Sequence, residues 1–530
     1  MKKILLISYC LSLSMYLFGQ EKPVILFLLD DPMIEKTEEI QARIEAQYLA
    51  HADLLELDSI LYSTDLSKEH FLGKKGNSFY LVDFAGQQYL FAEELAQADT
   101  ATEALILREP MDFPKEIGQL KNLKYLQLNL NGDMGAEIGQ LQELQTLQLW
   151  QNQEGRFSSA IRKLPKLENL MLSGCSKLPW QLYHLKSLKK LSIELNTEIT
   201  LSRSINQLSQ LEELSWTYSS LERLDGNMAI FKRLKRLDLG RNILNSLPPT
   251  IGTWKNLREL RLSENNLETL PKAIGQCQAL EQLIVHDNAL ATLPESMGQL
   301  KQLKTLELQG NQLERLPAGL MQAEALRILD LGDNPLRQLP EEIGNLKQLE
   351  VLNLGKDQLS EGDQLVSLPN SLGQLQQLEK LIVNNNRLRT LPKSLGNCRS
   401  IRNLELINNQ LTALPSSLGQ LEKLENLFLR GNNLQALPDS LSRLQSLEWL
   451  DLSNNNRLTA LPEDIGALDQ LKNLDISGTG IKHLPKSIEK LDALEYLVIH
   501  KGQISEEELR RIHKSLPSLT TYLVEKESRL

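Results

Sequence analysis

Residues that could carry out catalysis are scattered along this sequence and do not form a recognisable reactive set. The acidic pair Asp30-Asp31 directly follows an apolar run at residues 24–29, and acidic pairs at strand ends can bind metal ions or act as nucleophiles. No companion motif accompanies the pair, so we interpret it as a helix N-terminal cap and a solvated turn. The sequence contains neither G-x-S-x-G nor H-E-x-x-H, and it has no glycine-rich phosphate loop. We therefore predict that the protein is not an enzyme and needs no cofactor.

The feature that dominates the chain is a 23-residue repeat that begins at about residue 100. Residues 257–279 read LRELRLSENNLETLPKAIGQCQA, and residues 280–302 read LEQLIVHDNALATLPESMGQLKQ. A weak unit near Thr102 precedes seventeen clearer ones, which gives about eighteen repeats. The clearer units open at Leu123, Leu144, Leu167, Leu188, Leu211, Leu234, Leu257, Leu280, Leu303, Leu326, Leu349, Leu378, Ile401, Leu424, Leu447, Leu471 and Leu494.

The spacing L-x-x-L-x-L-x-x-N-x-L within each unit has a mechanical meaning. Its alternating centre predicts a short strand that points leucines inward and variable residues outward. The asparagine side chain can then bond backbone groups that the following turn leaves unpaired. A Leu-Pro pair ends the extended segment, and the I-G-x-L segment returns along the other side. One unit cannot cover its own leucines, so stacked units must share a continuous core.

This pattern resembles the leucine-rich-repeat family across residues 100–504, and eleven successive units between Leu247 and Leu484 carry the Leu-Pro pair. The L-P-x-x-I-G-x-L signature is similar to the 23-residue subtype of Ras-pathway scaffolds and many bacterial proteins. The resemblance implies an α/β solenoid, a horseshoe with a parallel β-sheet on its concave face, and binding on that face. It does not imply a particular partner.

The regions outside the repeats have their own signals. Residues 1–20 have a basic start, an apolar run and a small residue, which is the layout of a secretory signal peptide. We expect residues 21–99 to cap the first repeat with an α/β segment, including helices between about residues 33 and 62 and a hairpin across Gly86. Residues 505–530 should cap the other end, with a helix opened by a capping box of Ser505 and Glu508 and a last strand at residues 519–524.

Two irregularities interrupt the repeats. Units before Leu234 are looser, with Cys175 and Ser219 at the asparagine position. The unit that opens at Leu349 has six extra residues around positions 360–365, which predict a polar loop at one rim. Loop additions of this kind cost little free energy, so the loop is either neutral or a contact for a partner.

Charge and cysteine content exclude several classes of protein. The chain has 58 basic and 68 acidic residues, for a formal net charge of −10, which argues against a nucleic-acid binder that neutralises phosphates. Cys10 lies in the signal-like segment, and Cys175, Cys277 and Cys398 remain. Cys277 and Cys398 occupy equivalent positions five repeats apart, roughly 24 Å at about 4.8 Å per strand, which is too far for a disulfide. We interpret the three as small buried residues rather than a disulfide framework or a metal site.

Outward strand positions, counted as 3, 5 and 7 from the first leucine of a unit, are mostly polar, and two apolar groups break this rule. The first group comprises Ile382, Ile407, Phe428 and Trp449, with Tyr496 and Val498 further along. The second comprises Tyr125, Trp150 and Met171 in three consecutive units. Exposed aromatic residues are typical of interaction hot spots, although isolated apolar residues also occur on ordinary surfaces. We expect each group to lie side by side on the concave face, with Glu259, Glu307 and Asp330 between them attracting basic partners.

The leading hypothesis is therefore an exported, non-enzymatic scaffold or recognition protein that binds a partner on its concave face, either a protein or, as an alternative, a glycan. We expect no nucleic-acid partner and no membrane span after removal of the signal segment, and the oligomeric state is left open. A first alternative is a cytoplasmic signalling scaffold of the Ras-pathway type. A second alternative makes residues 21–99 a small catalytic or sensing module that the repeats direct to a target.

Overall fold

The computed structural model describes residues 59–61, 70–75, 78–83 and 88–91, and residues 101–525 except for 152–154, 175–178, 195–204, 206, 225–227, 229–230 and 358–363. The expected signal segment, the apolar run at 24–29 with its acidic pair, Cys175 and most of the six-residue insertion lie outside the described residues. The chain divides into two compact units, residues 1–175 with 179–187 and residues 176–178 with 188–530.

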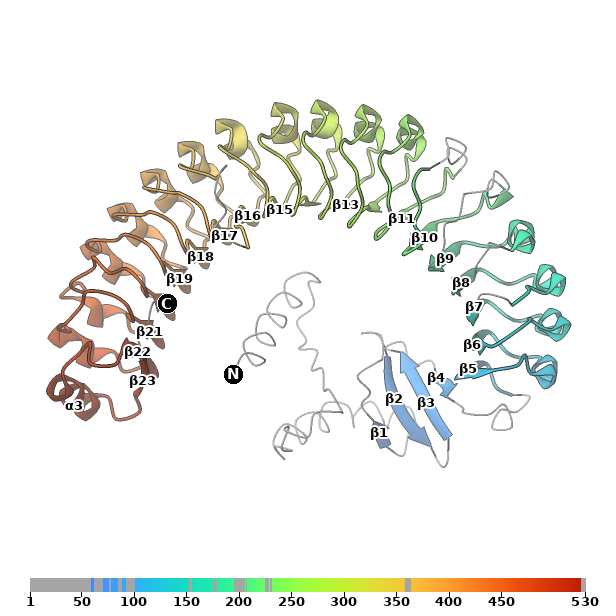
Figure 1. The fold of residues 1–530 in the computed structure, drawn as a ribbon, viewed down its shortest axis with the longest axis horizontal. Helices are drawn as coiled ribbons and strands as arrows, with labels where there is room; N and C mark the ends of the chain where they lie inside the picture. The colour runs from blue at the N-terminus through green and yellow to red at the C-terminus, as the bar shows by residue number, and fades with distance from the viewer. Residues whose placement is uncertain are drawn as a thin grey trace. The chain divides into compact units, whose positions relative to one another are not determined.

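The first unit contains an antiparallel part followed by parallel strands (Figure 1). Its strands are β1 (Ser59–Leu61), β2 (His70–Lys75), β3 (Ser78–Asp83), β4 (Gln88–Phe91), β5 (Ala104–Met111), β6 (Tyr125–Leu130), β7 (Thr146–Gln151) and β8 (Asn169–Ser173). Neighbours from β1 to β4 pair antiparallel, and neighbours from β4 to β8 pair parallel. The hairpin predicted across Gly86 is confirmed as β3 and β4. The prediction that helix extends to about residue 62 is wrong at its end, because residues 59–61 pair with β2 as a strand.

The second unit is a single run of parallel strands, each paired with the strand of the next repeat. These strands are β9 (Lys190–Glu194), β10 (Glu213–Thr217), β11 (Arg236–Asp238), β12 (Glu259–Arg261), β13 (Gln282–Ile284), β14 (Thr305–Glu307), β15 (Ile328–Asp330), β16 (Val351–Asn353), β17 (Lys380–Ile382), β18 (Asn403–Glu405), β19 (Asn426–Phe428), β20 (Trp449–Asp451), β21 (Asn473–Asp475), β22 (Tyr496–His500) and β23 (Thr520–Val524). Strands β5 to β22 correspond one to one to the eighteen predicted repeats. The predicted solenoid with a parallel sheet is therefore confirmed.

The return segments of most repeats are short 3-10 helices. In the first unit they are η2 (Lys115–Gln119), η3 (Ala136–Gln140), η4 (Ser159–Lys163) and η5 (Trp180–His184). In the second unit they are η8 (Pro249–Thr253), η9 (Lys272–Gln276), η10 (Glu295–Gln299), η11 (Ala318–Gln322), η12 (Glu341–Asn345), η13 (Asn370–Gln374), η14 (Lys393–Asn397), η15 (Ser416–Gln420), η16 (Asp439–Arg443), η17 (Ile465–Ala467) and η18 (Lys486–Lys490). In the second unit the strands line the concave side and these helices the convex side (Figure 1).

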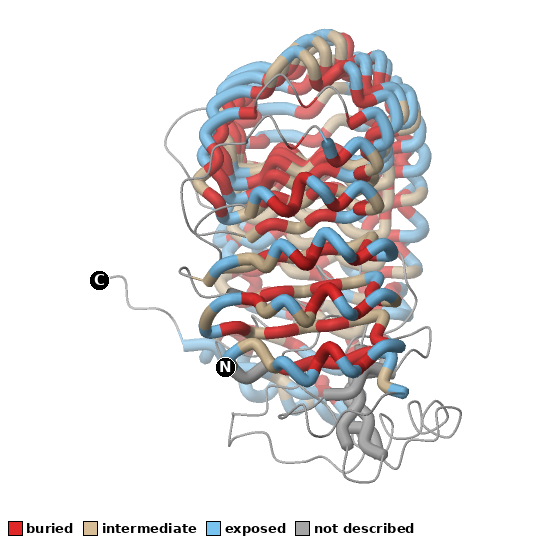
Figure 2. Tube along the Cα trace, turned by 90° about the vertical axis from the view of Figure 1, so that its right-hand side faces the viewer, coloured by how far each residue is buried: buried red, intermediate tan, exposed pale blue. Residues whose placement is uncertain are grey.

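Close packing of the return segments explains the I-G-x-L motif. A Cβ atom added to Gly298 would lie 2.3 Å from the carbonyl oxygen of Gly319 in the next repeat, which is closer than real Cβ contacts allow. The isoleucine or leucine before the glycine is buried in each helix, as Ile274 and Leu395 show. Buried and exposed positions recur from coil to coil along the chain (Figure 2). Each repeat thus covers the apolar side chains of its neighbours, as the period requires.

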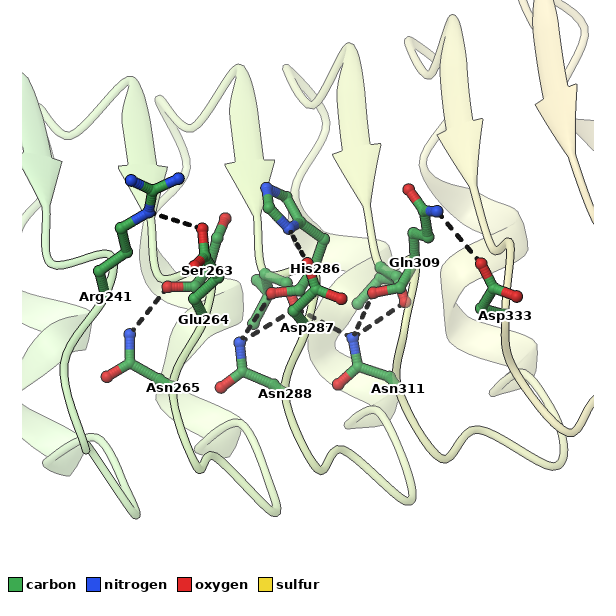
Figure 3. Close-up of polar contacts among 12 residues, drawn as sticks. Arg241, Ser263, Glu264, Asn265, His286, Asp287, Asn288, Gln309, Asn311 and Asp333 are labelled. Carbon is green, nitrogen blue, oxygen red and sulfur yellow. Dashed lines mark hydrogen bonds and ion pairs between the residues drawn. The ribbon is translucent and has the colours of Figure 1, made fainter. Parts of the chain in front are cut away.

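Nine asparagines, eight of them buried and Asn288 half-buried, form a ladder along the second unit, and Figure 3 shows three of them. In each, the amide nitrogen donates to a carbonyl of the preceding repeat, and the amide oxygen accepts a backbone N–H from that repeat. The nine are Asn242, Asn265, Asn288, Asn311, Asn334, Asn386, Asn409, Asn432 and Asn455. The predicted role of the asparagine is confirmed. The residue before it often has a positive φ, for example 54° at Asp287 and 66° at Gly310, which favours Asp, Asn and Gly there.

The end of the second unit is closed by helix α3 (Glu506–Ser515) and strand β23, as predicted. The Ser505 side chain accepts the Glu508 N–H at 3.2 Å, which is one half of the expected capping box. The second expected bond, from the Ser505 backbone N–H to the Glu508 side chain, is wrong. The Glu508 carboxylate instead accepts the backbone N–H of Leu484 at 2.7 Å. Gln503 ends the asparagine ladder by donating to the Ile476 carbonyl at 2.9 Å.

Candidate functional site

The concave face of the second unit is built by the outward side chains of three-residue strands. In β14 to β19 the middle leucine of each strand is buried, and the residues on either side of it are half-buried. Strict register places residues with the same position number next to one another on neighbouring strands, so that Glu405 of β18 lies opposite Phe428 of β19. Position numbers therefore decide which outward side chains can touch.

Phe428 and Trp449 form the clearest contact on this face. Their ring centroids lie 5.5 Å apart at an interplanar angle of 63°, an edge-to-face arrangement. Trp449 is 44% exposed, and Phe428 is half-buried. The strand register sets Trp449 opposite Asn426, two residues before Phe428, so the two rings meet diagonally across β19 and β20. This pair offers an amphipathic aromatic surface on a rigid support.

The other two members of this predicted group lie on β17 and just beyond β18. Ile382 lies at the same position number as Phe428, but Glu405 of β18 stands between them in the register. Glu405 is paired with Lys380 at 3.4 Å. Ile407 lies beyond the end of β18, where its backbone N–H donates to the Asn384 amide at 2.8 Å. Phe428 and Trp449 are the pair whose contact the structure gives, and the expectation that Ile382 and Ile407 lie beside them stays a prediction.

A second aromatic pair lies on the last two strands of the unit. The rings of Tyr496 and Tyr522 are stacked, with centroids 5.8 Å apart and planes inclined by 28°. Tyr496 is 37% exposed and Tyr522 is 53% exposed, and the register places Tyr522 opposite Val498. Sequence reasoning did not single out Tyr522, because it lies after the last recognisable repeat. Its signal was the alternation in the strand predicted at residues 519–524, which turns residue 522 to the same face as Val498.

The group predicted in the first unit lies on the three neighbouring strands β6, β7 and β8. Tyr125 of β6 lies opposite Thr146, whereas Trp150 lies four residues further along β7, a separation of roughly 13 Å at about 3.3 Å per residue. Met171 of β8 lies opposite Gln148, between these two levels. All three side chains are half-buried. Tyr125 and Trp150 are therefore not side by side, whereas Met171 lies diagonal to Trp150 on the neighbouring strand, in the same relation as Trp449 to Phe428.

Carboxylates on the concave face of the second unit fall into two kinds. Glu259 contacts both Arg236 and Arg261, so its charge is already balanced, contrary to the expectation that it would attract a basic partner. Glu307 and Asp330 lie opposite each other on β14 and β15, and neither has an ion pair among the described residues. Burial raises the pKa of Glu307, and the charge of Asp330 raises it further. Burial also raises the pKa of Asp330, despite hydrogen bonds from the Gly332 backbone and the Asn353 side chain.

The described residues offer little for catalysis. His286 and Asp287 lie 2.9 Å apart (Figure 3), but neither contacts a nucleophilic side chain within the part of the chain that the structure describes. Cys277 and Cys398 are buried free thiols that donate to carbonyls of the preceding repeat, at 3.2 Å in each case. No three His, Cys, Asp or Glu side chains of the described residues are placed to bind a metal ion. Likewise, none of the described helices is long and apolar enough to cross a bilayer.

Comparison with known proteins agrees with this architecture. The family described as leucine-rich repeat region matches residues 112–243, 318–410 and 440–529, and the leucine-rich repeat family matches residues 232–290 and 399–458. A leucine-rich-repeat protein of Leptospira interrogans is 38% identical, with a TM-score of 0.57, over 67% of this chain and 96% of its own. A search of curated proteins gave no match.

More distant structures share the fold alone. The Toll–Spatzle complex of Drosophila is 19% identical over 83% of this chain and 67% of that chain, with a TM-score of 0.65. The plant peptide hormone receptor RGFR1 in complex with RGF2 is 22% identical over 84% of this chain and 82% of that chain, with a TM-score of 0.55. The family matches and the Leptospira protein show that the chain belongs to the leucine-rich-repeat family.

Proposed function

We propose that this protein is a non-enzymatic recognition protein that binds a protein or peptide on the concave face of its second unit. The observation that carries the proposal is the pair of exposed aromatic contacts, Phe428 with Trp449 and Tyr496 with Tyr522, on one parallel sheet. Exposed Trp and Tyr on a rigid support are the residues that most often dominate binding energy. The Toll structure is a complex with Spatzle, and the peptide hormone receptor RGFR1 was solved in complex with RGF2, which is in keeping with such a role.

A pull-down from native extract tests this proposal, with the full chain as bait. Phe428→Ala/Trp449→Ala should lose the specific partner, whereas Trp180→Ala should keep it. Trp180 is a matched control because it is 52% exposed but lies on a return segment and not on a strand. For the purified partner, Trp449→Ala should weaken binding by about 2 kcal/mol or more in calorimetry. A partner held equally by wild type and the double variant would refute the proposed site.

We also propose that residues 1–20 direct export and that residues 21–99 serve as a cap, rather than as a catalytic or sensing module. Support for the cap comes from β4, which pairs in parallel with β5 and so continues the sheet past the first repeat. Sequencing the mature N-terminus tests export, and an intact Met1 in a cytosolic product would favour the scaffold alternative. Expression of residues 21–99 alone tests the cap, because a stable, active product would contradict it.

A further inference from the structure

The concave face of the second unit carries concentrated negative charge four strands from its aromatic pair, and Arg261 and His286 offset part of it. Glu307 and Asp330 are adjacent, half-buried and without an ion pair among the described residues. Some other carboxylates of this face are balanced, as Glu405 is by Lys380, but Asp451 and Asp475, opposite each other on β20 and β21, also lack an ion pair among the described residues. At the adjoining rim, the Asp357 N–H donates to the Asp333 carboxylate, and Asp333 raises the pKa of Asp357. This part of the face therefore favours a cationic group from a partner.

The spacing between the two features follows from the register. Asp330 and Phe428 have the same position number on β15 and β19, four strand spacings apart. At about 4.8 Å per strand this is roughly 19 Å, the length of about six residues of extended chain. A segment that crosses the strands could therefore place one side chain on each feature.

Two neighbouring carboxylates also select among cations. Glu307 and Asp330 lie opposite each other on adjacent strands. Their Cα atoms are therefore about 5 Å apart, and their carboxylates extend from the same face of the sheet. A planar guanidinium presents several donors at once and suits such a pair better than a single ammonium group. The edge-to-face rings of Phe428 and Trp449 offer contact to an aromatic or large aliphatic side chain.

We propose that the partner of this face is an extended peptide segment with an arginine or lysine about six residues from an aromatic or large aliphatic residue. This inference rests on the proposed function and specifies its partner. The basic side chain contacts Glu307 and Asp330, and the apolar side chain contacts Phe428 and Trp449. The segment crosses β15 to β20 along the direction in which the repeats stack.

Selection from a library of random twelve-residue peptides displayed on phage, with the immobilised full chain as target, tests this proposal. Enriched peptides should carry the basic and apolar residues at the stated spacing. Synthetic copies should bind Glu307→Gln/Asp330→Asn about tenfold or more weakly, the loss expected for a charge-assisted hydrogen bond. Gln and Asn keep the acceptor oxygens, so this variant should fold. Glu463→Gln/Asp492→Asn removes two exposed charges from return segments and should bind like wild type.

The outcomes separate this inference from the proposed function. The basic partner residue is ruled out if the enriched peptides lack one, or if they bind Glu307→Gln/Asp330→Asn as tightly as wild type. In that case, weaker peptide binding by Phe428→Ala/Trp449→Ala would still support the concave site. If no peptide is enriched, the inference of an extended peptide partner fails, and the pull-down still decides the proposed function. If the enriched peptides bind Phe428→Ala/Trp449→Ala as tightly as wild type, both proposals fail.

Discussion

Replacement of Asn265 by alanine should destabilise the repeats around it far more than replacement of its neighbour Asn266. Asn265 is 7% exposed, and its amide nitrogen donates to the carbonyls of Leu239, Leu262 and Ser263 at 2.9 to 3.1 Å. Its amide oxygen accepts the backbone N–H of Leu244 at 2.9 Å. Asn266 is exposed and follows directly. The pair differs in burial but not in residue type, so each substitution removes the same atoms.

The expected magnitude follows from which groups lose their last partner. The Leu239 carbonyl retains Asn242, and the Leu262 carbonyl retains Asn288. The Ser263 carbonyl also keeps a second bond, from a backbone N–H. Only the Leu244 N–H is left without a partner, which costs about 1–3 kcal/mol, and the loss of the other bonds adds about 1 kcal/mol. We expect a total of about 2–4 kcal/mol.

Urea denaturation followed by circular dichroism measures the global effect, and amide hydrogen exchange measures the local one. Asn265→Ala should lower the unfolding midpoint and speed exchange in peptides that contain Leu244. Asn266→Ala should change the free energy of unfolding by no more than about 0.5 kcal/mol. Equal effects of the two substitutions, or unchanged exchange at Leu244 in Asn265→Ala, would refute the ladder as a source of stability.

Three further predictions concern buried groups. Burial raises the pKa of Asp330 in the folded state, so its charge costs stability above that pKa. Asp330→Asn should therefore raise the melting temperature near pH 7, and the gain should disappear as the pH falls toward about 4. A Cβ on Gly396 would lie 2.2 Å from a backbone carbonyl oxygen, so Gly396→Ala should lower the free energy of unfolding by about 1–3 kcal/mol. A Cβ on Gly240 would have contacts of 3.4 Å, so Gly240→Ala should change thermal unfolding little and serves as the control. Burial raises the pKa of the Cys277 and Cys398 thiols to about 11, so mass spectrometry should find neither alkylated by iodoacetamide at about pH 8 until the protein unfolds.

The repeat architecture could be predicted from the sequence because each unit restates the same local rules. Alternation with period two separates buried leucines from outward residues, and the position of each asparagine fixes a turn whose unpaired backbone groups it must satisfy. The same reasoning placed Cys277 and Cys398 in the interior, where both are found.

Contacts between distant positions were harder to predict. The Glu508 carboxylate bonds Leu484, 24 residues away, rather than completing its local capping box. The strand at residues 59–61 forms because β2 pairs with it, and no local signal identifies that partner. The separation of Tyr125 from Trp150 depends on position numbers, which need the register and not only the order of the repeats.

The constant spacing of the hydrogen bonds in the asparagine ladder allows such a chain to gain or lose whole repeats. Each amide side chain reaches the carbonyl 26 residues earlier and the N–H 21 residues earlier, as Asn311 does with Val285 and Leu290. Where six residues are inserted, Asn386 still reaches the equivalent carbonyl of Leu354, now 32 residues away. Duplication or excision of one whole unit would therefore bring every donor back to an equivalent acceptor. Unequal recombination could lengthen or shorten the recognition surface in evolution while the interior keeps the same bonds.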